Sequence, residues 1–255
     1  SIAGRLFAES MLTRKGRHHV WAFSLHNPLQ RMTIDVQEHV SLAQFTTLGI
    51  GGPARFFARA TSVDDVAEAI EWCRARELRL FVLGGGSNLL IADRGFDGRG
   101  LRIESRGLTV ESSGEAAIVN AAAGEEWDAF VEMAVARGWA GVECLSGIPG
   151  SVGATPIQNV GAYGQEVSET VARVEALDRG TLRTRWFTND ECRFGYRASL
   201  FKNLEQDRWI VLSVTYALRP GGEPSIKYPD LKAQLVADGI GEASLADVRR
   251  AVIAV

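Results

Sequence analysis

The chain has 255 residues, of which 46% are hydrophobic and 23% are charged. This composition is typical of a globular protein that buries a sizeable core. The 28 Lys and Arg residues against 31 Asp and Glu residues give a net charge of −3, which argues against broad binding to nucleic acid or to a membrane surface. No apolar run approaches the roughly 18 residues that a membrane helix needs, so a membrane protein is excluded.

The cysteines and histidines give no pattern of a metal site. Cys73, Cys144 and Cys192 are widely spaced, with no CxxC pair, and an odd number of isolated cysteines fits a reducing compartment. Of the four histidines, only His39 lies outside the first 26 residues. We therefore expect no metal and a cytoplasmic location.

The first 31 residues differ from the remainder of the chain. They hold five Lys or Arg residues and one acid. Their apolar run, Val20–Phe23, is shorter than the roughly 7–15-residue core of a secretory signal. We expect residues 1–31 to be an atypical extension, a leader or added sequence, with Met32 as a plausible native start.

The first predicted helix follows Thr61 and Ser62, which are expected to cap it. Two aspartates stand in its first turn, and Val66, Ile70 and Cys73 recur at the spacing of one helical face. A second helix is predicted after Gly124, with Gly138 as its C-terminal stop. Its apolar face is expected to consist of Trp127, Phe130, Val131, Ala134 and Val135.

Short apolar or alternating runs predict strands between and after these helices. The predicted strands are 55–60, 78–83, 101–103, 108–112, 117–121, 173–178, 183–187 and 210–218. Short strands with few helices favour an α+β fold and not the strict alternation of a doubly wound sheet.

A final helix is predicted after Ser244, with Leu245, Val248, Val252 and Val255 on one face. The chain stops on that face without a glycine or an exit loop, which indicates a polypeptide cut short. We expect the apolar stripe to have no partner, so the helix should fray or associate with another molecule.

Three stretches have residue patterns that suit ligand binding or catalysis. In Leu83–Leu90, a strand runs into three glycines, so phosphate oxygens could approach backbone N–H groups without a Cβ in the way. It lacks the Gly-Lys-Ser/Thr of a P-loop and the GxGxxG of a Rossmann site, and a plain tight turn is the alternative.

The second stretch, Gly147–Gly164, is glycine-rich with almost no charge. It suits either a flat, largely apolar ligand such as a flavin or close packing against a helix.

The third stretch is Cys192–Lys202, in which Arg197 follows Tyr196. An arginine beside aromatic residues suits a two-point grip on a carboxylate, although arginine is also common in surface ion pairs.

Together these stretches resemble one family, the UDP-N-acetylenolpyruvoylglucosamine reductases. The resemblance begins near Thr46–Gly52 and covers roughly four-fifths of the chain. Its most specific parts are the run Gly150–Gly164 and the later Tyr-Arg-x-Ser-x-Phe-Lys. The resemblance implies a vanillyl-alcohol-oxidase-type fold, whose two α+β subdomains hold FAD between them. The implied divisions are 32–106 and 107–220 for the two FAD-binding subdomains, and 221–255 for the start of an incomplete substrate-binding domain.

The resemblance also implies the site residues. The FAD pyrophosphate would be held by Gly84, Gly85, Gly86, Ser87, Asn88 and Leu89. The flavin would be lined by Gly150, Ser151, Val152, Gly153, Ala154, Asn159, Gly161 and Ala162. Substrate would contact Gln158, Tyr163, Arg197 and Tyr228, and Arg197 would be catalytic because it pairs with the enolpyruvyl carboxylate.

The activity implied is reduction of a UDP-sugar enolpyruvyl ether to UDP-N-acetylmuramate for peptidoglycan, with NADPH as a diffusible reductant. The chain would be monomeric, with no nucleic-acid or membrane partner. The family's proton-donating serine, in a Gly-Ser-Phe-Phe-type stretch, and its late glutamate have no counterpart in residues 205–255. Two alternatives therefore stand: a non-catalytic FAD-binding protein, or another oxidoreductase of the same flavin fold.

Overall fold

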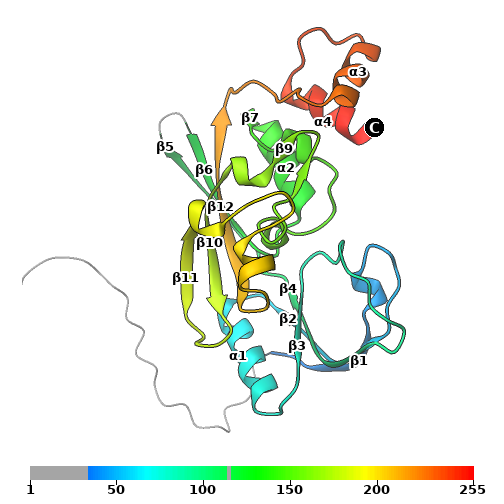
Figure 1. Ribbon diagram of the computed structural model, residues 1–255, viewed down its shortest axis with the longest axis vertical. Coiled ribbons are helices and arrows are strands. Elements are labelled where there is room, and N and C mark those ends of the chain that lie inside the picture. Colours follow the sequence, from blue (N-terminus) through cyan, green and yellow to red (C-terminus); the bar gives the residue numbers. More distant parts are fainter. Residues whose placement is uncertain (1–33, 114–115) are drawn as a thin grey trace, which may run out of the picture. The chain divides into compact units, whose positions relative to one another are not determined.

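The computed structural model describes residues 34–113 and 116–255, and the predicted extension 1–31 lies outside these ranges. Within the described residues, a four-stranded and a six-stranded sheet are accompanied by four α-helices (Figure 1). The four-stranded sheet is built from residues 37–103 and the larger one from residues 108–220. The mixture of strands and helices agrees with the predicted α+β class.

The four-stranded sheet has the order β1-β2-β4-β3. Its strands are β1 (Gln37–Ser41), β2 (Pro53–Ala60), β3 (Leu80–Leu83) and β4 (Phe96–Ile103). The central strand β4 runs parallel to both β2 and β3, whereas β1 is antiparallel to β2. Since β2 and β3 run in the same direction, the chain between them must cross back, and helix α1 (Val63–Arg74) makes that connection.

Helix α1 begins where the sequence predicted. The Ser62 side chain accepts a hydrogen bond from the backbone of Asp65, and the Asp65 side chain accepts one from the backbone of Ser62. This reciprocal capping satisfies N–H groups that have no partner within the helix. The predicted face is confirmed, since Val66, Ile70 and Cys73 are all buried.

The larger sheet is antiparallel, with the order β11-β10-β12-β6-β5. Its strands are β5 (Leu108–Ser113), β6 (Ala116–Ala122), β10 (Val171–Asp178), β11 (Thr184–Thr188) and β12 (Trp209–Pro220), and the short β7 (Trp139–Ala140) pairs with the end of β12. In Figure 1, β12 lies between β10 and β6. Side chains alternate between half-buried and buried along β6, as expected for a strand with one face on a core.

Helix α2 (Trp127–Ala136) packs its aromatic side chains against β12. The ring of Tyr216 on β12 lies 4.7 Å from the Phe130 ring and 5.8 Å from the Trp127 ring, centroid to centroid. All three side chains are buried. The helix ends before Gly138, which has φ of +68°, so the predicted glycine stop is confirmed.

Most ends of the predicted strands lie no more than two residues from the ends of the observed strands. The exception is β4, which begins at Phe96 and not at Leu101, because Gly98, Arg99 and Gly100 interrupt the apolar pattern that the prediction followed. Strand β1 was missed because its side chains are largely exposed and polar. Three short elements were also missed: strand β7, the hairpin of β8 (Gly161–Ala162) with β9 (Gln165–Glu166), and the π-helix Leu200–Leu204. The remaining short helices are the 3-10 turns Ala43–Phe45, Glu143–Leu145, Val152–Ala154, Val167–Glu169 and Asp190–Cys192.

The C-terminal residues form α3 (Pro229–Ala237) and α4 (Leu245–Ala254), which follow one another at the red end of Figure 1. The capping role of Ser244 is confirmed. The expectation that α4 has an unpartnered apolar stripe is wrong: Val248 and Val252 are buried in a cluster with Cys144, Leu231 and Leu235. Helix α3, which the sequence analysis did not predict, supplies two of these partners. Only the last residue of the stripe, Val255, is exposed.

Candidate functional site

The first two glycine-rich stretches meet in space. A Cβ at Gly85 would lie 2.4 Å from Gly150 Cα, and one at Gly84 would lie 2.7 Å from Ser151 Oγ. A side chain at Gly84 would require the Ser151 hydroxyl to turn away, whereas one at Gly85 would require the backbone to move, so the absence of a Cβ at Gly85 is what allows the strand end at β3 to approach this loop.

Gly86 is fixed from its other side by the segment that follows the Ala43–Phe45 turn. Its φ is +71°, and a Cβ there would lie 1.7 Å from the carbonyl oxygen of Phe45. The backbone of Thr47 donates a hydrogen bond of 3.2 Å to the Gly86 carbonyl. The loop therefore lies between residues 45–47 and residues 150–151. Glycine is required there because a Cβ at Gly85 or Gly86 would clash with the neighbouring backbone, and because Gly86 has a positive φ.

A cavity of about 230 Å³ lies where these stretches meet. It is lined by Ser87, Asn88, Trp127, Ile148, Pro149, Gly150, Ser151, Ala154, Thr155, Gln158 and Val160. The buried Trp127 ring is held by a hydrogen bond from its Nε1 to the Leu145 carbonyl. The combination of an aromatic wall, exposed glycine backbone and neutral polar side chains fits a flat ligand with polar edges.

Two predicted residues are hydrogen-bonded to each other in the lining of this cavity. Asn88, from the first stretch, donates from Nδ2 to the Gln158 Oε1 of the second stretch at 3.1 Å. Asn88 was expected to contact cofactor and Gln158 to contact substrate. Their hydrogen bond places both side chains at the same edge of the cavity.

Val152, Gly153 and Leu89, three of the predicted cofactor contacts, do not line the cavity. Val152 is buried in the core, and a Cβ at Gly153 would lie 2.5 Å from Ala123 Cβ. Leu89 packs against the apolar cluster around Phe45 and Phe57.

Asn159 is buried and all its polar atoms are engaged. Its Nδ2 donates to Glu166 Oε2 at 2.7 Å and to the Gly195 carbonyl at 3.0 Å, and its Oδ1 accepts from the Ser168 backbone at 3.1 Å. Asn159 thus ties the hairpin β8–β9 to the turn that carries Arg197.

The third stretch lies beside the second. Arg197 donates from Nη2 to the carbonyl of Gly161, although 36 residues separate the two in sequence. Arg197 has φ of +52°, in a turn closed by reciprocal backbone hydrogen bonds between Gly195 and Ala198. Lys202 Nζ donates to the Arg197 carbonyl at 2.9 Å. The guanidinium remains exposed next to Gly161, so it is available to an anionic group.

Tyr163 and Tyr228 contact one another edge to face, with ring centroids 5.5 Å apart and planes at 89°. The segment before Tyr228 is fixed by Glu143, whose Oε1 accepts from the Ser225 backbone at 2.8 Å. The Cys144 thiol donates to the Ser225 carbonyl. The structure therefore brings two predicted substrate residues together from distant parts of the chain.

Some lining residues were missed by the sequence analysis. Trp127 was identified only as a core residue, whereas Thr155, Ile148 and Val160 were not singled out at all. Ile148 and Pro149 lie directly before Gly150, so the glycine-rich pattern itself could have marked them. Thr155 Oγ1 shares a hydrogen bond of 2.8 Å with the buried Tyr216 hydroxyl, and burial raises the pKa of Tyr216.

The described residues show neither a metal-binding cluster nor a membrane-spanning helix. No group of three or more His, Cys, Asp or Glu side chains is placed to hold a metal ion in residues 34–113 and 116–255. Across the same part of the chain, no helix has the length and apolar character needed to cross a membrane.

Curated relatives share the name UDP-N-acetylenolpyruvoylglucosamine reductase. The chain is 47% identical over 220 residues to that protein from Cutibacterium acnes, covering 86% of this chain and 58% of the relative. It is 44% identical to the protein of that name from Thermobifida fusca, over 87% of this chain and 62% of the relative. It is also 44% identical to the one from Pseudomonas aeruginosa, over 88% of this chain and 66% of the relative. The chain thus spans about three-fifths of the length of the relatives it matches.

Solved structures agree on the fold. The UDP-N-acetylenolpyruvylglucosamine reductase of Thermus caldophilus matches with a TM-score of 0.59 and 28% identity, over 86% of this chain and 69% of that one. The cholesterol oxidase of Brevibacterium sterolicum matches with a TM-score of 0.52, at 18% identity, over 78% of this chain and 40% of that one, a likeness of fold alone. The arrangement is that of the vanillyl-alcohol-oxidase type.

The model of a family described as "FAD binding domain" matches residues 54–184, a range that contains both glycine-rich stretches of the cavity. The chain therefore belongs to the FAD-binding domain family, and within it to the sequences homologous with UDP-N-acetylenolpyruvoylglucosamine reductases.

Proposed function

We propose that this chain is the flavin-holding part of a UDP-N-acetylenolpyruvoylglucosamine reductase, the enzyme named in its relatives. The observation that carries the proposal is the junction of Gly84 and Gly85 with Gly150 and Ser151, together with the contact of Arg197 with Gly161, the residue after the cavity-lining Val160. A cavity with a backbone cradle thus lies near one exposed guanidinium. In this proposal, residues 32–106 and 107–220 are the two FAD-binding subdomains, and residues 221–255 begin the substrate-binding part.

The residues present fit FAD. Gly84–Gly86 would hold the pyrophosphate, because backbone N–H groups without an adjacent Cβ can be approached by phosphate oxygens. Ser87 and Asn88 add neutral donors, and Gly150, Ser151 and Ala154 would line the flavin. Bound FAD would supply hydride transfer, with NADPH as the diffusible source of electrons.

Arg197 would pair with the carboxylate of the enolpyruvyl group. Addition of hydride to the double bond builds negative charge next to that carboxylate, and a paired guanidinium stabilises it. The Gly161 carbonyl takes one of the guanidinium N–H donors and leaves others for the carboxylate. Gln158, Tyr163 and Tyr228 would complete the contacts to the UDP-sugar. We further propose that the enzyme acts as a monomer in the cytoplasm.

The test is Arg197→Lys in the flavin-loaded, complete enzyme, of which this chain is proposed to be the flavin-holding part. A lysine keeps the charge but loses the planar two-point contact. Flavin reduction by NADPH should be nearly unchanged, whereas reoxidation by the enolpyruvyl substrate should slow about 10²-fold. Arg193→Lys, an exposed arginine in the same stretch, is the matched control and should alter neither half-reaction. Equal effects on both half-reactions, or none, would contradict the role of Arg197, and failure of the wild type to take up FAD would contradict the proposal as a whole.

A further inference from the structure

A second, larger cavity lies at the other end of strand β3 from the glycine loop. It has a volume of about 580 Å³ and is lined by Ile70, Cys73, Arg74, Leu78, Arg79, Leu80, Phe81, Phe96, Arg179 and Asp207. Strand β3 ends at Leu83, just before Gly84. This cavity is lined by the first residues of β3, whereas the glycine loop comes after the last residue of that strand. The two cavities share no lining residue.

The charges around this cavity are predominantly positive. Arg74, Arg79 and Arg179 line it, against the single carboxylate of Asp207. Within the described ranges, none of these three arginines forms an ion pair with a carboxylate. Uncompensated guanidinium groups on a cavity wall are typical of anion recognition.

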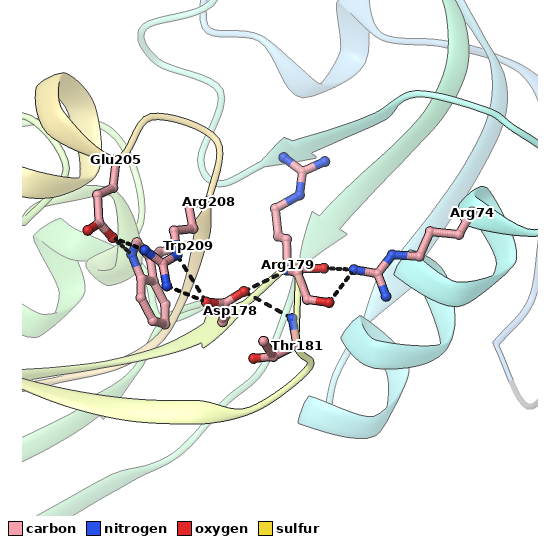
Figure 2. Close-up of polar contacts among 8 residues, drawn as sticks. Arg74, Asp178, Arg179, Thr181, Glu205, Arg208 and Trp209 are labelled. Atoms are coloured by element: carbon pink, nitrogen blue, oxygen red, sulfur yellow. Dashed lines mark hydrogen bonds and ion pairs between the residues drawn. The ribbon is translucent and has the colours of Figure 1, made fainter.

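The backbone contacts of Arg74 and Arg179 set the geometry of the wall. Arg74 on α1 donates from Nη2 to the carbonyls of Arg179 and Gly180, and the contact with Gly180 measures 2.8 Å. Figure 2 shows the Arg179 side chain extended away from those carbonyls, and its Nη2 donates to the Leu80 carbonyl at 3.1 Å. Each of these two guanidinium groups is therefore anchored through one nitrogen, that of Arg74 to two carbonyls and that of Arg179 to one, with other N–H donors left over.

Asp178 and Glu205, which could neutralise the cluster, are already engaged. Asp178 accepts from the backbones of Gly180 and Thr181 and pairs with Arg208, and Glu205 accepts from Arg208 and Trp209 (Figure 2). These carboxylates lie at the end of β10 and in the segment before β12. They are not the partners of Arg74, Arg79 or Arg179.

More positive charge lies behind the wall. Arg99 on β4 is completely buried, and its three guanidinium nitrogens have no hydrogen-bond partner within the described part of the chain. Its Cζ lies 4.7 Å from the centre of the Trp72 ring, over which Arg76 also lies at 4.3 Å. Glu68 is the carboxylate whose charge acts on Arg99. The Cys73 thiol, on the cavity wall, experiences the charges of Arg76, Arg99 and Arg179 together.

The apolar part of the wall combines Ile70, Leu78 and Leu80 with two aromatic rings. The rings of Phe81 and Phe96 lie 5.6 Å apart at 49°, and the Arg79 guanidinium lies 4.9 Å from the Phe96 ring. A planar base can pack on such rings while a charged group contacts the arginines. An anion without an apolar part would leave this surface unused.

We propose that this cavity is a second ligand site, separate from the flavin, that binds the diphosphate of a nucleotide on Arg74, Arg79 and Arg179 and its base on Phe81 and Phe96. Since the wall combines residues of β3 and α1 with residues 179 and 207 from the larger sheet's connections, an occupant would bridge the two sheets at this end.

The test is titration of ADP into the FAD-loaded protein by calorimetry. We expect saturable binding that weakens as salt is raised, with no comparable binding of adenosine, which has the base but no phosphates. Arg79→Glu should raise the dissociation constant at least about tenfold without loss of flavin. Arg137→Glu is the matched control, because Arg137 is also exposed and also stacks on an aromatic ring, that of Trp139 at 5.0 Å; it should leave binding unchanged.

Three results would overturn the proposal. Adenosine binding as tightly as ADP would show that the arginines contribute nothing. Equal weakening by Arg79→Glu and Arg137→Glu would show general electrostatic attraction. Binding that Arg197→Lys abolishes but Arg79→Glu leaves intact would place ADP in the site beside the flavin.

Discussion

Arg249 of the last helix and Asp128 of α2 form a two-point ion pair, with Nη1–Oδ1 at 2.6 Å and Nη2–Oδ2 at 2.9 Å. Asp128 Oδ1 also accepts from the backbone of Gly147 at 2.7 Å, at the start of the glycine-rich segment that lines the cavity. One carboxylate therefore connects the C-terminal helix to the segment that we expect to hold the flavin.

Replacing either partner of this pair should destabilise the protein. The hydrogen bonds from Arg249 hold the pKa of Asp128 below its ordinary value, against the opposing effect of burial. Asp128→Asn should lower the free energy of unfolding by about 1 kcal/mol at neutral pH, a figure that allows for solvent screening of the partly exposed carboxylate. Denaturant melts of both proteins measure the difference.

The pH dependence of that difference follows from the direction of the shift. A carboxyl group whose folded pKa is depressed contributes stability above its unfolded pKa, about 3.9, and loses it as pH falls through the folded value. The gap between wild type and Asp128→Asn should therefore close below about pH 4. Arg250→Lys, which alters the exposed pair of Arg250 with Asp247, is the control and should have little effect; a larger loss there than at Asp128 would contradict this account.

Gly85→Ala should impair both folding and flavin uptake. The new methyl group would lie 2.4 Å from Gly150 Cα, so the two loops must separate or the strand must shift, and both movements disturb the cavity. We expect a lower melting temperature and less FAD recovered per mole of purified protein, read from flavin absorbance after denaturation. Gly241→Ala is the control, because a Cβ there meets nothing within 4 Å. An unchanged FAD content in Gly85→Ala would show that the contact between the loops does not shape the site.

The three cysteines should be unreactive in the native protein. All are buried. Burial, with a contribution from Glu143, raises the pKa of Cys144 to about 12, and burial with Glu191 raises that of Cys192 to about 12. Burial also raises the pKa of Cys73, against the lowering effect of nearby arginines. Since the thiolate is the reactive form, a colorimetric thiol reagent at pH 8 should label little of the native protein and all three cysteines in denaturant. Rapid labelling before unfolding would contradict this burial.

Asn159→Asp should loosen the turn that carries Arg197. Aspartate keeps the shape and tolerates the left-handed backbone found at this position, where φ is +45°. However, it cannot donate to the Gly195 carbonyl, and it would place a second carboxylate 2.7 Å from Glu166. We expect a loss of about 1–3 kcal/mol in stability and, on the proposed role of Arg197, slower reoxidation of reduced flavin by substrate.

The control for this variant is Asn189→Asp. Asn189 also donates two backbone hydrogen bonds, to Ser168 at 2.8 Å and Val171 at 2.7 Å, but it does not contact the Arg197 turn. It should lose stability and keep its rate of flavin reoxidation once the protein is folded. Equal slowing in both variants would show that stability alone, and not the position of Arg197, governs the rate.

Features that depend on near neighbours along the chain were predictable from the residues alone. Ser62 and Ser244 marked the first residues of two helices because a cap needs only the next three residues. The alternation along β6 and the apolar face of α2 were readable for the same reason. The glycine-rich stretches were also recognisable. A position without room for a Cβ must be occupied by glycine, whichever distant segment packs against it.

The tertiary structure alone decided which distant segments meet. Nothing local indicates that α4 packs on Cys144 and α3, that Arg249 reaches Asp128 across 121 positions, or that Asn159 joins Glu166 to the turn of Arg197. The burial of Arg99 is likewise invisible in the sequence, because a charged residue in a strand is normally expected to be exposed. These contacts depend on how sheets and helices pack once they have formed, and a local pattern carries no information about a partner that lies a hundred residues away.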